Sequence, residues 1–216
     1  MATQLKDRST PAGGNAVNAR ALTGDALALR DLLVKRTFKR GEFTLASGKR
    51  SRVYFNMKAT MMHPPGAALC ARLLLKRIAA LRPDFLGGLE MGAVPLLGTL
   101  AAYSEDAGTP FPAIFVRKEA KTHGTALMIE GLDDDGGETL VGKTVVLVDD
   151  VATSGGSVLK AIKQIETAGG RVSDAIVILD RQEGAAELLR AKGVTLHSLL
   201  TATDLGVTEA DRMPLA

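Results

Sequence analysis

The 216-residue sequence contains no tryptophan, and aromatic residues make up only 4% of it. Proteins that bind single-stranded nucleic acid without sequence preference need aromatic side chains on which bases stack, so this scarcity argues against that class. Basic and acidic residues nearly balance, with 27 Lys and Arg against 24 Asp and Glu, a formal net charge of +3. We therefore expect no nucleic acid among the partners.

Cysteine is also scarce, since Cys70 is the only one. A single cysteine cannot form an intramolecular disulfide, and this suits the reducing cytoplasm, where we expect the protein to act. No apolar run approaches the roughly 18 residues that a membrane-spanning helix needs, so we expect no membrane partner. With 46% hydrophobic and 24% charged residues, the composition is that of a globular chain long enough to bury its own core.

Residues 1–20 are small and polar, Pro11 interrupts them, and they lack the apolar stretch of a secretion signal. We expect a flexible tail there, followed by a single domain over residues 21–216. A helix is predicted after Thr23, a residue type that favours helix N-caps.

Apolar segments alternate with helix-forming segments along the domain. Two short strands are predicted within residues 43–58, around a turn at Ser47-Gly48. The later predicted strands cover residues 85–90, 113–118, 143–149, 175–180 and 194–200, and the helices cover 67–82, 93–103, 156–168 and 184–191. Strands that are apolar almost throughout, separated by helices, predict an α/β fold with a central parallel sheet flanked by helices. Ligands of such sheets bind beyond the carboxyl ends of the strands.

One phosphate-binding pattern in the sequence is misleading. Residues Gly137 to Thr144 fit GxxxxGK[ST], which binds phosphate only where it lies between a strand and a helix. Here Asp133, Asp134 and Asp135 precede it and would repel phosphate, and the apolar segment VVLVDD follows it. We predict a solvated turn that leads into a strand.

A stronger phosphate site follows that strand, at whose carboxyl end Asp149 and Asp150 lie. A run of small and hydroxyl residues then leads into a helix: Val151, Ala152, Thr153, Ser154, Gly155, Gly156 and Ser157. The free N–H groups and the dipole of a helix N-terminus attract anions, and glycine lets the backbone approach them closely. Carboxylates repel phosphate but accept hydrogen bonds from hydroxyl groups. A ribose 5-phosphate, which carries a phosphate and neighbouring hydroxyls, therefore fits both the helix N-terminus and the two carboxylates. The alternative is a solvated acidic loop before a capped helix.

At these residues the sequence resembles the type I phosphoribosyltransferases, whose signature of this form binds phosphoribosyl pyrophosphate (PRPP). Three further segments are similar to the orotate phosphoribosyltransferase family. They are FTLASG with SRVYFN in residues 43–56, RKEAKTHG in residues 117–124 and DRQEG in residues 180–184. The resemblance covers about residues 22–200. It implies the type I phosphoribosyltransferase fold, with a small N-terminal hood and a mobile catalytic loop.

The implied hood covers about residues 21–62 and the implied loop about residues 117–126. The resemblance implies transfer of the phosphoribosyl group to N1 of orotate, with release of pyrophosphate, which gives orotidine 5′-monophosphate for UMP synthesis. It also implies a homodimer in which the loop of one subunit reaches the active site of the other. Magnesium accompanies the pyrophosphate; we expect substrate oxygens and water to hold it, near Asp149 and Asp150 but without a direct protein ligand.

The loop segment is dense in cations, with Arg117, Lys118 and Lys121 against one acid, Glu119. This density suits a polyanion, so we predict that these cations and His123 are catalytic and bind the pyrophosphate of PRPP. His123 alternatively moves a proton. The alternative to a catalytic loop is a solvated basic hairpin that binds no substrate.

The resemblance also implies an orotate site, to which we assign Thr153, Arg181, Tyr54 and Phe55. Arg181 follows a predicted strand, and its planar fork can grip the carboxylate of orotate. The alternative for Arg181 is a surface ion pair with Glu183. Tyr54 and Phe55 alternate on a strand, so at least one of them can belong to the core instead.

Two positions depart from the family's pattern. Some members carry a substrate-binding lysine where this chain has Ala46. The cations available to replace it are Lys49, Arg52 and Lys58. We predict Lys58. The segment at residues 90–95 also lacks a lysine found there in some members, and we expect the N–H groups of Gly92 and Ala93 to bind pyrophosphate instead.

Two other functions stay open. A phosphoribosyltransferase for another base, such as a purine, would retain the ribose-phosphate site, but a neutral purine gives no reason for an arginine at the base end. A non-catalytic protein that senses PRPP and regulates transcription or another enzyme would need that site without the basic loop. Such a regulator would usually add a nucleic-acid-binding element, and no basic recognition helix is visible in the sequence.

Overall fold

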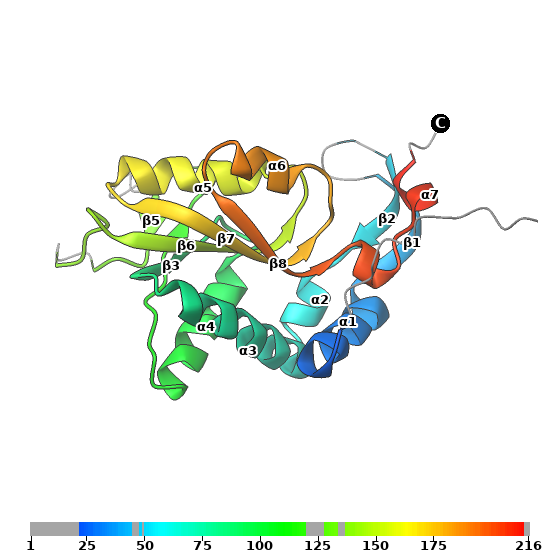
Figure 1. Ribbon diagram of the computed structural model, residues 1–216, viewed down its shortest axis with the longest axis horizontal. Coiled ribbons are helices and arrows are strands. Elements are labelled where there is room, and N and C mark those ends of the chain that lie inside the picture. Colours follow the sequence, from blue (N-terminus) through cyan, green and yellow to red (C-terminus); the bar gives the residue numbers. More distant parts are fainter. Residues whose placement is uncertain (1–21, 45–47, 49, 120–127, 134–136, 214–216) are drawn as a thin grey trace, which may run out of the picture.

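The computed structural model describes residues 22–44, 48, 50–119, 128–133 and 137–213. A four-stranded parallel sheet in the order β3-β6-β7-β8 runs through its middle (Figure 1). Its strands are β3 (Phe85–Gly87), β6 (Thr144–Ala152), β7 (Arg171–Asp180) and β8 (Thr195–Thr201). The predicted tail lies outside the described residues.

Helices cover both faces of this sheet (Figure 1). On one face lie α1 (Gly24–Arg36), α3 (Pro64–Leu81) and α4 (Val94–Asp106), and on the other α5 (Gly156–Thr167) and α6 (Ala185–Arg190). Because both faces are covered, the middle of β7 from Ala175 to Leu179 is buried without a break, which explains its uninterrupted apolar sequence. The predicted α/β fold is confirmed, and α1 begins directly after Thr23 as expected.

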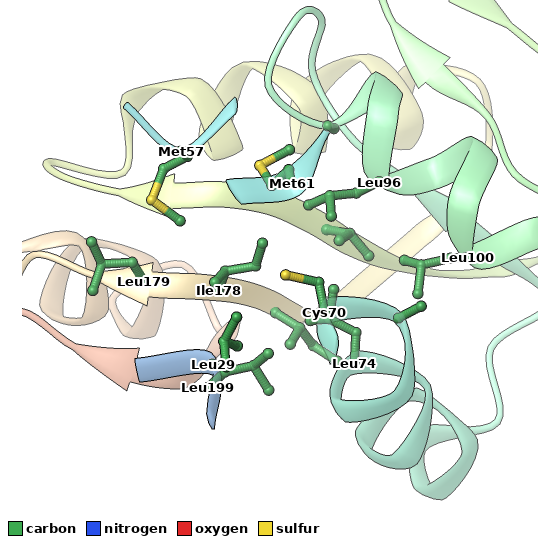
Figure 2. Close-up of a cluster of buried hydrophobic side chains, with 14 of the residues drawn as sticks. Leu29, Met57, Met61, Cys70, Leu74, Leu96, Leu100, Ile178, Leu179 and Leu199 are labelled. Atoms are coloured by element: carbon green, nitrogen blue, oxygen red, sulfur yellow. The ribbon is translucent and has the colours of Figure 1, made fainter. Parts of the chain in front are cut away.

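Side chains from both ends of the chain meet in the core on the α3 face (Figure 2). Leu29 from α1, Leu74 from α3 and Ile178 from β7 are all fully buried there. Cys70 lies among them, and burial raises the pKa of its thiol to about 12, so this cysteine is a protonated packing residue. Met57 and Met61 fix the short helix α2 (Lys58–Met61) to the same core.

An antiparallel hairpin of β1 (Phe38–Thr44) and β2 (Arg50–Phe55) stands apart from the main sheet. The predicted strands at residues 43–58 were partly wrong, because pairing begins at Phe38 and the chain turns into α2 from Lys58. Phe38 and Phe55 stack across the hairpin with ring centroids 5.2 Å apart. The extent of a hood at residues 21–62 stays a prediction.

Two short strands, β4 (Phe115–Val116) and β5 (Ile129–Glu130), form an antiparallel ribbon. Isolated bridges from Ala113 and Val116 join β4 to the β3 segment. The strand β6 begins at Thr144, so no helix follows the GxxxxGK[ST] pattern and its rejection is confirmed. The chain ends with the short turns η1 (Thr203–Leu205) and α7 (Glu209–Arg212) beside the hairpin (Figure 1). Within the described ranges, every helix is too short or too polar to cross a membrane.

Candidate active site

The carboxyl end of β6 opens into a cleft of about 280 Å³. Its lining consists of Asp149, residues 151–158 and Lys160. Gly155 precedes α5 with φ of +82°, a left-handed conformation that glycine adopts readily. No acidic residue lies in the first turn of α5, so Asp149 is the one acidic group among the described residues that line this cleft with the helix N–H groups and Lys160. Anion binding by this cleft stays a prediction.

The first residues of the predicted PRPP segment are strand rather than loop. Val151 pairs with Leu179 and Ala152 with Asp180. Ala152 is only 2% exposed, and its carbonyl accepts a hydrogen bond from Arg181 N–H at 2.9 Å. Beyond the strand, Thr153 is half-buried, whereas Ser154, Gly156 and Ser157 are exposed.

Asp149 and Asp150 lie side by side at the rim, and the N–H of Asp150 donates to Asp149 Oδ1 at 2.9 Å. Burial, followed by the charge of Asp150, raises the pKa of Asp149 to about 8. Burial also raises the pKa of Asp150, which is 8% exposed. The positive charge of Lys58 acts against both shifts, which places this predicted cation within electrostatic reach of the two carboxylates.

The raised pKa of Asp149 makes stability depend on pH. The unfolded carboxyl has a pKa of 3.8 and the folded one of about 8, so the folded protein binds the proton more tightly and ionisation opposes folding. We expect the free energy of unfolding to fall between about pH 4 and about pH 8 and then level off. In Asp149→Asn this fall should be smaller, measured by urea denaturation across that range.

The matched control is Asp106→Asn, which changes an exposed carboxyl at the end of α4. Its pH dependence should follow that of the unaltered protein. If Asp149→Asn shows the same pH dependence as this control, the shift assigned to Asp149 is wrong.

Gly92 approaches both carboxylates from the segment after β3. A Cβ atom at this position would lie 2.6 Å from Asp149 Oδ1 and 2.8 Å from Asp150 Oδ1, closer than side-chain atoms pack. One expectation here was wrong: the N–H of Ala93 is not free for pyrophosphate, because it donates to the Leu89 carbonyl at 3.3 Å as α4 begins. The N–H of Gly92 is the remaining backbone candidate.

Arg117 and Lys118 lie at the base of the predicted loop. Arg117 Nη1 is 3.5 Å from Glu130 Oε1, and the backbone N–H of Arg117 donates to Met128 O at 2.8 Å. The backbone N–H of Lys118 donates to Glu90 Oε1 at 2.8 Å, and its side chain is exposed. These contacts tie the ribbon to the segment that carries Gly92. Lys121 and His123 lie outside the described residues, and all four catalytic roles stay predictions.

A second cleft, of about 600 Å³, lies between β2 and the segment that follows β7. Arg181 and Phe55 both line it, and the Arg181 guanidinium carbon is 5.2 Å from the Phe55 ring centroid. Arg181 Nη2 pairs with Glu183 Oε1 at 2.7 Å, so the alternative ion pair exists. However, the Arg181 side chain is only 11% exposed, and its buried Nε has no hydrogen-bond partner among the described residues. Glu183 is 44% exposed, so the pair has one buried and one exposed end, and it stays an alternative to orotate binding.

Of the other predicted base-site residues, Phe55 lines the cleft of Arg181, Thr153 lines the cleft at the end of β6, and Tyr54 lines neither. Tyr54 is 40% exposed, packs on Phe43 with ring centroids 5.4 Å apart, and does not line the cleft of Arg181. Phe55 points to the opposite side, where it also packs against the core. Thr153 lines the phosphate cleft, and its carbonyl accepts the N–H of Ala185. The hydrogen bond from Arg181 to Ala152 joins the two clefts across adjacent strand ends.

The comparisons with known proteins agree with this geometry. The model of the phosphoribosyl transferase domain family matches residues 59–196, so the class of protein is that of the phosphoribosyltransferases. An orotate phosphoribosyltransferase of Bradyrhizobium sp. is 48% identical over 176 residues, which are 82% of this chain and 94% of the relative. One of Methanopyrus kandleri is 45% identical over 83% of this chain and 91% of its own. The chain belongs to the orotate phosphoribosyltransferase family, as its motifs predict.

Solved structures show the same relationship. Orotate phosphoribosyltransferase of Mycobacterium tuberculosis in complex with PRPP has a TM-score of 0.70 and 30% sequence identity, covering 85% of this chain and 100% of that one. An adenine phosphoribosyltransferase from Leishmania donovani, at 21% identity and a TM-score of 0.62, shares the fold alone.

Proposed function

We propose that this protein transfers the phosphoribosyl group of PRPP to N1 of orotate, giving orotidine 5′-monophosphate and pyrophosphate in the cytoplasmic synthesis of UMP. The observation that carries the proposal is the position of two clefts at adjacent strand ends, linked by the backbone hydrogen bond from Arg181 to Ala152. One offers helix N–H groups beside two carboxylates, and the other offers the partly unsatisfied guanidinium of Arg181. A phosphorylated sugar and an anionic planar base fit these two halves.

In the phosphate cleft, the backbone N–H groups and hydroxyls of residues 153–157 bind the 5′-phosphate. Asp149 and Asp150 accept hydrogen bonds from the ribose hydroxyls. Two adjacent carboxylates, in a described region that holds no cluster of three metal-ligating side chains, fit a magnesium ion that keeps substrate and water ligands. When bound, that ion neutralises negative charge on the pyrophosphate oxygens.

In the base cleft, the free Nε–H of Arg181 donates to the orotate carboxylate, while the Phe55 ring forms the apolar wall beside it. Thr153 lines the cleft at the end of β6, and Lys58 adds positive charge near the carboxylates. The β1–β2 hairpin covers the base as a hood. The assignment of Tyr54 to the orotate site rests on the family resemblance alone.

Catalysis is electrostatic positioning, because positive charge develops on the sugar as negative charge leaves with pyrophosphate. Asp149 and Asp150 face the sugar, and the N–H of Gly92 faces the leaving group. The basic residues of the 117–126 loop, Lys121 and His123 among them, complete the site from the partner subunit of a homodimer and exclude water.

The function is tested by measuring pyrophosphate release from PRPP with orotate, uracil, adenine and hypoxanthine in parallel. Release with orotate alone is expected. Release with a purine alone would support a transferase for another base, and PRPP binding without release for any base would support a sensor. Either of these outcomes rejects the proposal.

Arg181→Gln tests the base site separately. Loss of one charge-assisted hydrogen bond of about 1.5–3 kcal/mol should raise the KM for orotate by about 10-fold to 100-fold, while the KM for PRPP changes little. The control is Arg190→Gln, an exposed position on α6 remote from both cleft linings. Equal effects of the two substitutions on orotate KM would remove Arg181 from the base site.

A further inference from the structure

The C-terminal segment 206–212 reaches back to the base cleft through Arg212 on α7. Arg212 Nη1 donates to the backbone carbonyl of Arg181 at 2.8 Å. Arg212 Nη2 donates to Gln182 Oε1, also at 2.8 Å. One planar guanidinium therefore fixes two consecutive residues, the first of which carries the guanidinium assigned to orotate.

Gln182 needs such support because of its backbone conformation. Its φ of +60° lies in the left-handed region, which costs free energy for residues other than glycine. Its N–H donates to Asp180 Oδ1 at 2.7 Å, and its side-chain oxygen accepts from Thr203 Oγ1 at 2.7 Å as well as from Arg212. The turn that aims Arg181 is thus held mainly by contacts from the C-terminal part of the chain.

The segment 206–212 is itself anchored to the hairpin. Thr208 and Asp211 form a reciprocal capping box at the start of α7. Arg40 on β1 donates to the Gly206 carbonyl at 2.6 Å and lies 3.4 Å from Asp211. Both walls of the base cleft, the hairpin and the Arg181 turn, are consequently joined by this one segment, which lies beside the hairpin in Figure 1.

We propose that Arg212 is a positioning residue for orotate, acting through Arg181 and Gln182. This inference rests on the proposed function. Arg212 is exposed and itself lines the base cleft, and its guanidinium donates hydrogen bonds to Arg181 and Gln182. We therefore assign it to fixing the direction of the Arg181 fork. A guanidinium that turns away from the orotate carboxylate loses a charge-assisted hydrogen bond, which small displacements disrupt.

The test compares Arg212→Ala and Arg212→Lys with the control Arg190→Ala, measuring KM for each substrate, kcat and the melting temperature. Arg212→Ala should raise the KM for orotate by about tenfold and leave the KM for PRPP within about twofold. The preference for orotate over uracil should fall by a similar factor. Arg212→Lys should lie between, because one ammonium cannot serve both acceptors in the geometry of the fork.

A purely structural role would lower the melting temperature and the active fraction without changing the KM for orotate, and that result in Arg212→Ala would overturn the inference. If Arg212→Ala does not fold, the test uses Arg212→Lys instead. An orotate KM of Arg212→Lys equal to that of the unaltered protein would then overturn the inference. An unaltered protein that does not turn over orotate would instead reject the proposed function, so the two failures are distinguishable.

Discussion

Gly92→Ala is expected to reduce kcat/KM for PRPP by about 100-fold or more, because a displaced carboxylate pair no longer matches the substrate. The added methyl carbon would stand 2.6 Å from Asp149 Oδ1 and 2.8 Å from Asp150 Oδ1. Both atoms are the ends of short side chains on a buried strand end, where little room is left for them to turn away. Either both carboxylates or the segment after β3 must shift, and each of them faces PRPP in the proposed site.

The matched control is Gly98→Ala, in the helix that begins just after Gly92. Nothing lies within 4 Å of a Cβ atom at Gly98, which has an ordinary helical conformation within α4. We expect unchanged activity there and a gain in stability of about 0.5–1 kcal/mol from alanine's better helix propensity. Steady-state kinetics and urea denaturation on both variants decide the matter, and activity above half of the unaltered level in Gly92→Ala would contradict the assignment.

Much of the fold and of the phosphate cleft is readable from local sequence. The apolar runs of β6 and β7 predict a buried parallel sheet, because only strands covered on both faces dispense with polar alternation. Asp149 and Asp150 followed by glycines predict the anion cradle, since the chemistry lies within one continuous stretch of chain.

Contacts between distant segments were not readable in this way. Glu90 accepts from the backbone of Lys118, and Arg212 donates to the backbone of Arg181 about 30 residues away. A hydrogen bond to a backbone group leaves no pattern in the partner's residue type, so the sequence around Arg181 does not indicate its support. Whether Tyr54 or Phe55 faces the base cleft likewise depends on hairpin register, which tertiary packing decides.

Lys121→Ala is expected to lower kcat by about 100-fold to 1,000-fold, the usual effect of removing one group that stabilises transition-state charge. Lys121 follows the anchored loop base, where Arg117 pairs with Glu130 and Lys118 is tied to Glu90. Lys121 is assigned to the leaving pyrophosphate and not to the fold, so denaturation curves should not change. Lys192→Ala, at an exposed position after α6, is the control and should retain full activity.

Mixing variants tests whether the loop acts across subunits. In a mixed dimer of Lys121→Ala and Gly92→Ala, the intact loop of the second chain meets the intact cleft of the first, which leaves one complete site. Random reassociation should then restore about a quarter of the unaltered activity, because half of the dimers are mixed and each has one of two sites working. No recovery, in a mixture shown to contain mixed dimers, would mean that Lys121 serves the cleft of its own chain. Since a loop acting within its own chain leaves both sites of the mixed dimer defective, recovery can arise only from exchange between subunits.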